Sequence, residues 1–367
     1  MTEIAFVLGT RPEIIKLAPV IRACGRHGVA HAVIHTGQHY SERLDEVFFD
    51  QLELSEPDVN LGIGSGSHGE QTGEMLTGIE RELERLDPDV VVVQGDTNSA
   101  LAGAIATSKM GPELAHVEAG LRSFDRSMPE ETNRVVADHV AEHLFAPTEK
   151  SKWYLVREGI SELRIAVTGN TVVDALQRNR ELARRKSSVL GDLDLEERRY
   201  LLMTAHRQEN VDDADRFGSL LDGVARAGTE QGFEVVYPVH PRARARLDEF
   251  GLDVPAPVRA IEPQDYLDFV RLLSGSAAVL TDSGGVQEEA CILGVPCVTL
   301  RDNTERPETI EVGANRLSSC GPDRIRRATR EMLETDGSWE NPFGDGDAAE
   351  RILRELPVPA RTEEAAR

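Results

Sequence analysis

Short apolar stretches rich in valine and isoleucine alternate with segments of helical periodicity along the first half of the chain. Such near-continuous apolar runs are typical of parallel strands, because helices cover both faces of a parallel sheet. The expected strands are Ile4 to Leu8, Ala32 to Thr36, Val90 to Gln94, Leu114 to Val117 and Ile165 to Thr168. The first helix should open at Pro12, since proline is favoured just inside a helix start. We therefore expect a doubly wound domain over residues 1–170.

The alternation restarts after a long polar helix that follows Asn170 and runs into the loop 187–193, which we interpret as the interdomain connection. The strands expected in the second half are Tyr200 to Thr204, Glu234 to Val239, Arg259 to Ile261, Ala278 to Thr281 and Cys297 to Leu300. A last helix, Ala348 to Leu356, precedes a polar tail. The predicted fold is α/β, with two doubly wound Rossmann-like domains, 1–170 and 171–340, facing across a cleft, and a C-terminal segment 341–367.

The chain is strongly acidic, with 64 Asp and Glu against 41 Lys and Arg and a net charge of −23. This excess argues against nucleic acid or an anionic membrane as a partner, because either requires a basic face. A basic leader and an apolar run of about 20 residues are both missing from the sequence, which favours a cytoplasmic protein. Since an acidic, lysine-poor surface repels itself unless salt screens it, we also suspect a halophilic source.

The segment TDSGGVQEEA carries the strongest local signal for ligand binding. A buried strand should end at Thr281, so that Ser283, Gly284 and Gly285 open a helix whose free N–H groups can bind a diphosphate. Glu289 could accept the two ribose hydroxyls, as acidic residues do in dinucleotide sites. The alternative is an ordinary capped helix start with glycine for packing.

A second cluster, RDNTERPE, follows the strand that begins at Cys297 and places Arg306 at the carboxyl edge of the sheet. Ligands of open α/β sheets bind at this edge, and arginine suits a phosphate. Arg301 and Arg306 could instead be neutralised by neighbouring acids in a solvated charge cluster.

In the first half, charged residues follow the expected strands. Arg11 and Lys16 come after the first strand, and three acids are expected at later strand ends, where catalytic carboxylates commonly lie. The acids are Asp96, Glu118 and Glu130, with Arg134 one helical turn beyond Glu130. Asp96 could also be a plain helix N-cap. His206, after the first strand of the second half, is either structural or part of the site.

The patterns of cysteine and glycine residues predict neither a cofactor site nor a metal site. The four cysteines match neither a disulfide framework nor a zinc site, so buried reduced thiols are expected. The run Gly64 to Glu70 formally matches a dinucleotide fingerprint, yet it follows a polar stretch in the wrong unit of the fold, so we reject a nicotinamide site. No metal-binding pattern occurs in the sequence.

Nine motifs in order over residues 1 to about 320 resemble the non-hydrolysing UDP-N-acetylglucosamine 2-epimerase family. They are GTRPEIIK, QGDTNSALAG, AHVEAGLRSFDRSMPEETNR, GNTVVDA, TAHRQEN, PVHPR, EPQDYLDF, TDSGGVQEEA and RDNTERPE. The resemblance implies a fold like the B-type glycosyltransferases, UDP held by the C-terminal domain, and a final helix that returns to the N-terminal domain.

Carried onto matching positions, the resemblance implies two sets of site residues. The UDP contacts are Arg11, Lys16, Gln264, Phe269, Ser283, Gly284, Gly285, Glu289 and Arg306. The catalytic residues are Asp96, Glu118, Glu130, Arg134 and His206. Gln264 and Phe269 enter through the resemblance alone. The resemblance implies no metal ligand.

The implied reaction is reversible epimerisation of UDP-N-acetylglucosamine to UDP-N-acetylmannosamine. A carboxylate removes the proton on carbon 2 as UDP leaves, giving 2-acetamidoglucal, and the proton returns to the opposite face as UDP adds back, so acid/base groups are needed on both faces. No redox cofactor is required, because nothing is oxidised. The alternatives are a 2-epimerase of a UDP-2,3-diacetamido uronic acid sugar and a glycosyltransferase of the same fold.

Three further expectations follow. Bacterial members commonly continue Gln38-His39 with arginine, whereas Tyr40 and Ser41 follow here, which puts activation by a second substrate molecule in doubt. A homodimer is expected, because it is the commonest closed assembly. The product should serve surface polysaccharide synthesis.

Overall fold

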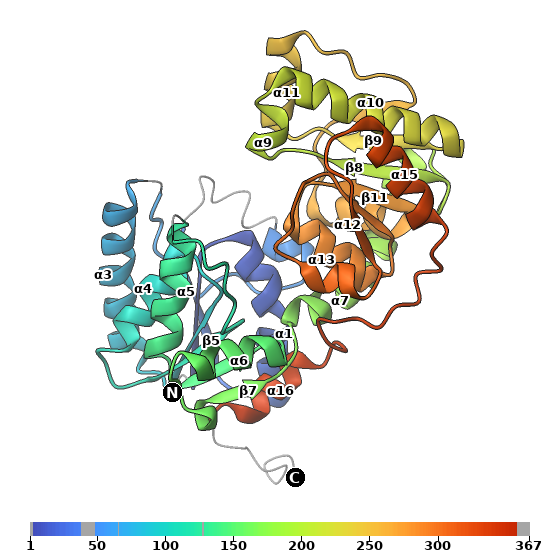
Figure 1. Cartoon of the computed structure of the whole chain (residues 1–367). Coiled ribbons are helices and arrows are strands. Elements are labelled where there is room, and N and C mark those ends of the chain that lie inside the picture. Colours follow the sequence, from blue (N-terminus) through green and yellow to red (C-terminus); the bar gives the residue numbers. More distant parts are fainter. Residues whose placement is uncertain (1–2, 38–47, 65, 127, 358–367) are drawn as a thin grey trace. The chain divides into compact units, whose positions relative to one another are not determined.

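The computed structural model describes residues 3–37, 48–64, 66–126 and 128–357, and the chain divides into two compact units (Figure 1). Unit 1 comprises Met1–Ala175 and Phe343–Arg367, and unit 2 comprises Leu176–Pro342. Gln38 to Ser41, where the departure from the bacterial pattern falls, lie outside the described residues.

Within the described residues, unit 1 has a seven-stranded parallel sheet in the order β3-β2-β1-β4-β5-β6-β7. Its strands are β1 (Ile4–Leu8), β2 (His31–His35), β3 (Val59–Asn60), β4 (Val90–Gln94), β5 (Glu113–Val117), β6 (His143–Ala146) and β7 (Ile165–Val167). The central strands are buried along their whole length, as expected of a parallel sheet covered on both faces.

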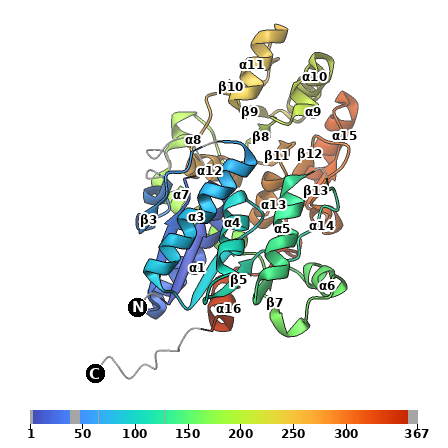
Figure 2. The same ribbon diagram turned by 90° about the vertical axis from the view of Figure 1, so that its left-hand side faces the viewer.

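The helices of unit 1 flank this sheet. They are α1 (Arg11–His27), α3 (His68–Leu86), α4 (Asn98–Thr107), α5 (Pro129–Val140), α6 (Glu149–Arg157), the start of α7 (Thr171–Lys186) and α16 (Ala348–Glu355), with a 3₁₀ turn η1 (Glu162–Arg164). Figure 2 shows α3, α4 and α5 in a row, and their apolar residues share one core with β1 and β4. Helix α16 packs against α1. Ser67 and Glu70 form a capping box at the start of α3, which explains the polar residues of this glycine-containing run.

Unit 2 has a six-stranded parallel sheet in the order β10-β9-β8-β11-β12-β13 within the described residues. Its strands are β8 (Tyr200–Thr204), β9 (Glu234–Pro238), β10 (Val258–Ile261), β11 (Ala278–Thr281), β12 (Cys297–Thr299) and β13 (Asn315–Leu317). Its helices, besides the end of α7, are α8 (Val189–Asp192), α9 (Gln208–Val211), α10 (Ala214–Gln231), α11 (Pro241–Phe250), α12 (Tyr266–Gly275), α13 (Gly284–Leu293), α14 (Pro307–Glu311) and α15 (Pro322–Leu333). Helices α10 and α15 pack together over a core that contains Phe217 and Tyr237.

Both strand orders are those of a doubly wound Rossmann-like sheet, so the predicted fold class is confirmed for each unit. Three strands were not predicted: β3, β6 and β13 have two to four residues and lack a run of β-branched residues. The loop expected over 187–193 contains the short helix α8. All four cysteines are buried free thiols, as predicted. In the part of the chain that the structure describes, no helix is long and apolar enough to cross a bilayer.

Candidate functional site

The expected site residues follow strands at the carboxyl edge of each sheet, next to the point where the strand order reverses. In unit 1 that point lies between β1 and β4, and in unit 2 between β8 and β11. Ligands of open α/β sheets bind in the crevice outside such a point, because the loops on its two sides run in opposite directions. Each unit therefore presents a candidate half-site of its own.

Glu118 directly follows β5 and is held by three side chains of unit 1. Lys16 Nζ donates to both carboxylate oxygens at 2.7 Å, Asn170 Nδ2 donates at 3.1 Å, and Gln94 donates from the end of β4. Glu118 is 7% exposed and has φ 70°, a left-handed conformation that costs a non-glycine residue energy. The carboxylate is thus nearly buried and fixed in direction.

Asp96 follows β4 and forms an ion pair with Arg134 of α5. Asn133, from the same helix, donates to the Asp96 carbonyl at 2.9 Å, so α5 positions this loop at two points. Both partners are half-buried, and the structure brings Asp96 and Arg134 together as a pair, which the sequence analysis did not predict. The plain N-cap alternative fails for Asp96, because Thr97 caps α4.

Glu130 and Glu131 lie side by side in the first turn of α5 but differ in environment. Glu131 is buried and accepts hydrogen bonds from Ser123 and Phe124; although burial opposes it, these bonds and Arg134 hold the pKa of Glu131 below its usual range. Glu130 is exposed, and its carboxylate makes no hydrogen bond or ion pair with the rest of the described chain. Glu131 is therefore a structural acid, and Glu130 is available for a substrate.

Glu13 is a site residue that the sequence did not reveal. Its carboxylate, fully buried in the first turns of α1, accepts from the Gly9 backbone N–H at 3.0 Å and from Thr97 Oγ1 at 2.7 Å. Burial raises the pKa of Glu13 to about 7, against these hydrogen bonds. Glu13 thereby ties the β1–α1 turn to the turn that carries Asp96. Arg11, in the same β1–α1 turn, is exposed and lies over the Phe48 ring, 5.6 Å from its centroid.

His116, within β5, contacts the loop that carries Asp96. Its Nδ1 lies 2.7 Å from Asp138 and its Nε2 lies 2.8 Å from the Gly95 carbonyl. Both neighbours are acceptors, so both ring nitrogens carry hydrogen and the ring is charged. Burial opposes this charge, yet Asp138 holds the pKa of His116 above its usual range. Arg122 also pairs with Asp138, at 2.6 Å, which completes a buried charged network.

In unit 2, His206 follows β8 and is positioned by Asp282, which follows β11. The Asp282 carboxylate is fully buried, accepts from the backbone N–H groups of His206 and Arg207 at 3.0 Å, and lies 3.1 Å from His206 Nδ1. Asn210 adds a further donor at 3.1 Å. Although burial opposes it, the hydrogen bonds hold the pKa of Asp282 below its usual range. An ionised Asp282 therefore orients the His206 ring, whose side chain stays 39% exposed.

The segment from Ser283 opens α13 as predicted, with Ser283 as the N-cap accepting from the Val286 N–H at 3.5 Å. Packing does not require glycine at the two positions that follow, Gly284 and Gly285. A Cβ on Gly284 would meet nothing closer than 3.7 Å, and one on Gly285 nothing closer than 4.0 Å. Glycine in a helix costs roughly 1 kcal/mol relative to alanine. The bare backbone at this helix start suits the close approach of a phosphate.

The other residues expected to contact UDP also belong to unit 2. Glu289 is half-buried on α13, five residues beyond the helix start. Gln264, just before α12, donates to the Glu262 carbonyl at 2.8 Å, and Phe269 lies half-buried on α12. These positions follow β10 and β11, at the same edge of the sheet as Ser283.

The two arginines of the RDNTERPE segment have different surroundings. Arg301 is 4% exposed and fixed by Glu305 at 2.7 Å and by Glu209 at 3.0 Å, so here the alternative of mutual neutralisation holds. The hydrogen bonds from Arg301, together with the charges of Arg207 and Arg301, lower the pKa of Glu305 to about 2. Arg306 has its Nε 3.5 Å from Glu288 and keeps 29% of its side chain exposed. Arg301 thus shapes the loop, and Arg306 faces outward from it.

Sequence reasoning missed the residues that hold the candidate site residues in place. Gln94 and Asn170 bind Glu118, Asp282 orients His206, and Glu13 bridges two turns. Each stands within one of the motifs quoted above or directly beside it, which was the available signal. The contacts themselves join residues far apart in the chain, so spacing could not reveal them.

The chain is similar to known proteins over nearly its whole length. The family model for UDP-N-acetylglucosamine 2-epimerase matches residues 22–357. The chain is 50% identical over 365 residues to UDP-N-acetylglucosamine 2-epimerase from Methanocaldococcus jannaschii, covering 96% of this chain and 98% of that one. The structure of that enzyme in complex with UDP-GlcNAc and UDP superimposes with a TM-score of 0.83 at 50% identity, covering 96% of this chain and 99% of that one.

Two further similarities define the limits of the resemblance. UDP-2,3-diacetamido-2,3-dideoxy-D-glucuronate 2-epimerase from Pseudomonas aeruginosa is 39% identical over 361 residues, covering 96% of this chain and 99% of that one. The calicheamicin glycosyltransferase CalG4 is 14% identical with a TM-score of 0.55, covering 96% of this chain and 94% of that one, which shows a shared fold alone. The match to the family model and the high identity over nearly the whole length show that the chain belongs to the UDP-N-acetylglucosamine 2-epimerase family.

Proposed function

We propose that this chain interconverts UDP-N-acetylglucosamine and UDP-N-acetylmannosamine by inverting carbon 2 of the sugar. The observation that carries the proposal is the 50% identity, over nearly the full length of both chains, to the Methanocaldococcus jannaschii enzyme of that name. The arrangement of acids in unit 1 and of a phosphate-binding helix start in unit 2 supplies the chemistry that this reaction needs.

Unit 2 holds the UDP. The N–H groups at the start of α13 and the Arg306 guanidinium bind the diphosphate, Glu289 accepts from the ribose, and Phe269 and Gln264 are further UDP contacts. Arg11 and Lys16 of unit 1 are further cationic contacts. His206, oriented by Asp282, stabilises the charge that develops on the diphosphate as the bond from carbon 1 to oxygen breaks.

Unit 1 moves the proton. In the gluco sugar the hydrogen on carbon 2 is antiperiplanar to the axial UDP, so a carboxylate removes it as UDP leaves. Protonation of the resulting 2-acetamidoglucal on the opposite face, with UDP adding back to carbon 1, gives the manno epimer. Asp96, Glu118 and Glu130 are the acid/base groups, with Arg134 and Lys16 holding the first two in place.

The test is an NMR time course with UDP-N-acetylglucosamine in deuterated water. The expected result is the manno epimer with deuterium at carbon 2, without any added acceptor. Release of UDP with formation of a glycoside only when an acceptor is supplied would instead identify a glycosyltransferase and contradict the proposal.

The same experiment assigns the acids. Asp96→Asn, Glu118→Gln and Glu130→Gln keep the side-chain shapes, and a variant that has lost the base for one face should stop exchanging deuterium from that face. Full exchange in all three variants would contradict the assignment. The charge-matched Glu131→Gln, next to Glu130, is the control and should exchange normally once it is folded.

A second candidate substrate is a UDP-2,3-diacetamido uronic acid sugar, favoured by the 39% identity to the Pseudomonas aeruginosa enzyme. Both substrates share the UDP and carbon 2 chemistry and differ at carbons 3 and 6. Parallel assays with the two sugars decide between them, since turnover of the uronic acid sugar alone would replace the first proposal.

We further propose that the enzyme is a homodimer of the cytoplasm, requires salt and supplies a precursor for surface polysaccharide. The composition supports the salt requirement, with a net charge of −23 and five lysines in 367 residues. Stability that does not change between tenths of molar and several molar salt would contradict it. Sedimentation velocity tests the dimer, which rests on the frequency of such assemblies.

A further inference from the structure

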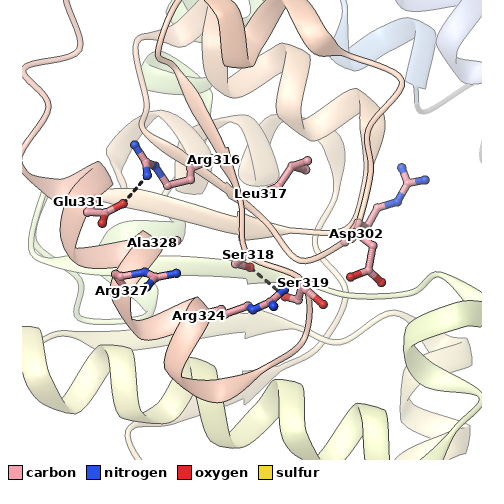
Figure 3. Close-up of a pocket in the computed structure, with 10 residues that line it drawn as sticks. Asp302, Arg316, Leu317, Ser318, Ser319, Arg324, Arg327, Ala328 and Glu331 are labelled. Atoms are coloured by element: carbon pink, nitrogen blue, oxygen red, sulfur yellow. Dashed lines mark hydrogen bonds and ion pairs between the residues drawn. The ribbon is translucent and has the colours of Figure 1, made fainter.

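A pocket of about 270 Å³ opens at the carboxyl end of β13, the edge strand of unit 2 (Figure 3). Three segments form its wall: the residues after β12, the end of β13 with the two serines that follow, and one side of α15. Of the residues assigned above to UDP or to the reaction, none lines this pocket. It lies beyond the loop after β12, whose other end carries Arg306.

The pocket is positively charged in a strongly acidic chain. Arg301, Arg316, Arg324 and Arg327 line it, opposed by Asp302 and Glu331. The whole chain has a net charge of −23. Scattered surface charges of such a chain should give a negative or neutral hollow, so a local excess of arginine calls for a specific reason.

Two of the four arginines are already neutralised. Arg301 is bound by Glu305 and Glu209, as described above, and Arg316 Nη1 lies 2.6 Å from Glu331. Asp302 is likewise committed, to Arg216 at 3.1 Å and to Ser319, and these hydrogen bonds lower its pKa. The two acids that line the pocket, Asp302 and Glu331, therefore already form ion pairs with Arg216 and Arg316.

Arg324 and Arg327 remain. Within the described chain neither guanidinium makes a hydrogen bond or an ion pair, and Figure 3 shows both reaching from α15 toward the pocket. They are three residues apart on one helix, where like charges repel. An exposed arginine is commonly just solvated. The charge of Arg324 helps to lower the pKa of Asp302, but neither Arg324 nor Arg327 has an acid of the described chain within ion-pair distance, and two such guanidinium groups beside one hollow are arranged as an anion clamp.

The wall opposite these arginines offers polar groups. Ser318 Oγ donates to the Thr299 carbonyl at 3.1 Å, and Ser319 has φ 58°, so the turn after β13 is fixed in a left-handed conformation. Leu317 is the apolar exception on this wall, and Ala328, in the middle of α15, also lines the pocket. A hydroxylated ligand with one strongly anionic end matches this lining better than an apolar one.

We propose that this pocket binds a small phosphate monoester of a polyol or sugar. The guanidinium groups of Arg324 and Arg327 hold the phosphate, because the planar fork of arginine matches phosphate oxygens in two-point contacts. The volume falls just below the roughly 300–1,000 Å³ of sites for drug-sized ligands, so a nucleotide sugar does not fit and a sugar monophosphate does. The site is independent of the proposed epimerase activity.

The test is calorimetric titration of the full-length protein with glucose 6-phosphate in low chloride. Saturating UDP is present to occupy the segment Thr281–Glu289, and UDP binding is measured separately, so that failure of the proposed function is recognised on its own. The expected result is one saturable site per chain, weakened about tenfold or more in Arg324→Gln/Arg327→Gln. Both positions are exposed and glutamine is a good helix former, so the variant should fold, which a thermal melt checks.

The matched control is Arg326→Gln/Arg330→Gln. It removes two charges from the same helix, but both side chains contact Glu230 outside this pocket. Binding should survive in the control. Three results would overturn the proposal: no saturable heat up to about 10 mM ligand, which corresponds to less than about 2.7 kcal/mol of binding; equal loss in the two double variants; or equal heat from sodium chloride.

Discussion

The buried carboxylate of Asp282 accepts a hydrogen bond from the backbone N–H of His206 at 3.0 Å and lies 3.1 Å from its Nδ1. One acid thus fixes both the main chain and the ring of the residue that follows β8. Because Asp282 directly precedes Ser283, the N-cap of α13, the residue that orients the histidine is adjacent in the chain to the start of that helix. This coupling gives the first prediction.

Asp282→Asn should lower turnover by up to about a hundredfold, the scale of losing one group that stabilises developing charge. It should also lower the free energy of unfolding by about 1–3 kcal/mol, because the amide cannot accept every hydrogen bond that the carboxylate accepts. Steady-state rates and denaturant titrations measure the two effects. In a His206→Asn background the substitution should reduce turnover little further, whereas additive losses would show that Asp282 does not act through His206.

Glu13 makes stability depend on pH near neutrality. Its pKa is about 7 in the folded protein against an ordinary 4.5, so the folded state binds more protons than the unfolded state between these values. The stabilisation is complete below pH 4.5 and is lost as pH rises to 7, by up to about 3 kcal/mol. Glu13→Gln, which imitates the protonated acid, should therefore become more stable than the natural protein as pH increases, as thermal melts from pH 5 to 8 would show.

Glu131 provides the control with the opposite sign. Its pKa is lowered in the folded protein, so its contribution is present above pH 4.5 and is lost as pH falls. Glu131→Gln should cost stability at pH 7 and cost less in acid. If both variants showed the same pH trend, the assignment of Glu13 as a protonated acid would be wrong.

Asp138→Asn should cost about 3–5 kcal/mol, because it leaves His116 and Arg122 as buried charges without their shared partner. Glu158→Gln is the comparison. Glu158 also contacts Arg122 at 2.6 Å but is 29% exposed, so its loss should cost less than about 1 kcal/mol. Denaturant unfolding measures both, and similar costs would mean that the network is not centred on Asp138.

Gly285→Ala should separate stability from binding. A Cβ there has open space, and alanine favours helix, so the free energy of unfolding should rise by up to about 1 kcal/mol. UDP affinity should fall if the phosphates approach the backbone at this point, as calorimetric titration would show. Gly228→Ala in α10 should instead destabilise the protein, because its Cβ would lie 2.8 Å from Val235 Cγ2. Unchanged UDP affinity in Gly285→Ala would remove the glycine from the proposed site.

The sequence sufficed for both sheets because their central strands are continuous apolar runs. The strand ends at Gln94, Thr204 and Thr281 were predicted to the residue. The sequence did not predict β13, because Asn315, Arg316 and Leu317 do not form an apolar run or an alternating pattern. Pairing with β12 holds these residues in a strand.

The candidate site was predictable only as a set of strand ends. Which of two adjacent acids faces outward, Glu130 or Glu131, depends on hydrogen bonds from the loop at Ser123 and Phe124. The support of Glu118 by Asn170 joins residues 52 apart in the chain. Such contacts are products of the tertiary fold, and periodicity carries no information about them.

Unit 1 is built from two separate stretches of the chain. The Asp174 carboxylate accepts from the backbone N–H groups of Ala348 and Ala349, and the Phe343 carbonyl accepts from the Asn170 N–H. During synthesis, residues 3–175 therefore leave the ribosome long before the helix that covers α1. The whole sequence of unit 2 is synthesised before α16, so unit 1, which carries the acids, is completed last. A chain whose synthesis stops before α16 would expose to chaperones the apolar face that this helix covers.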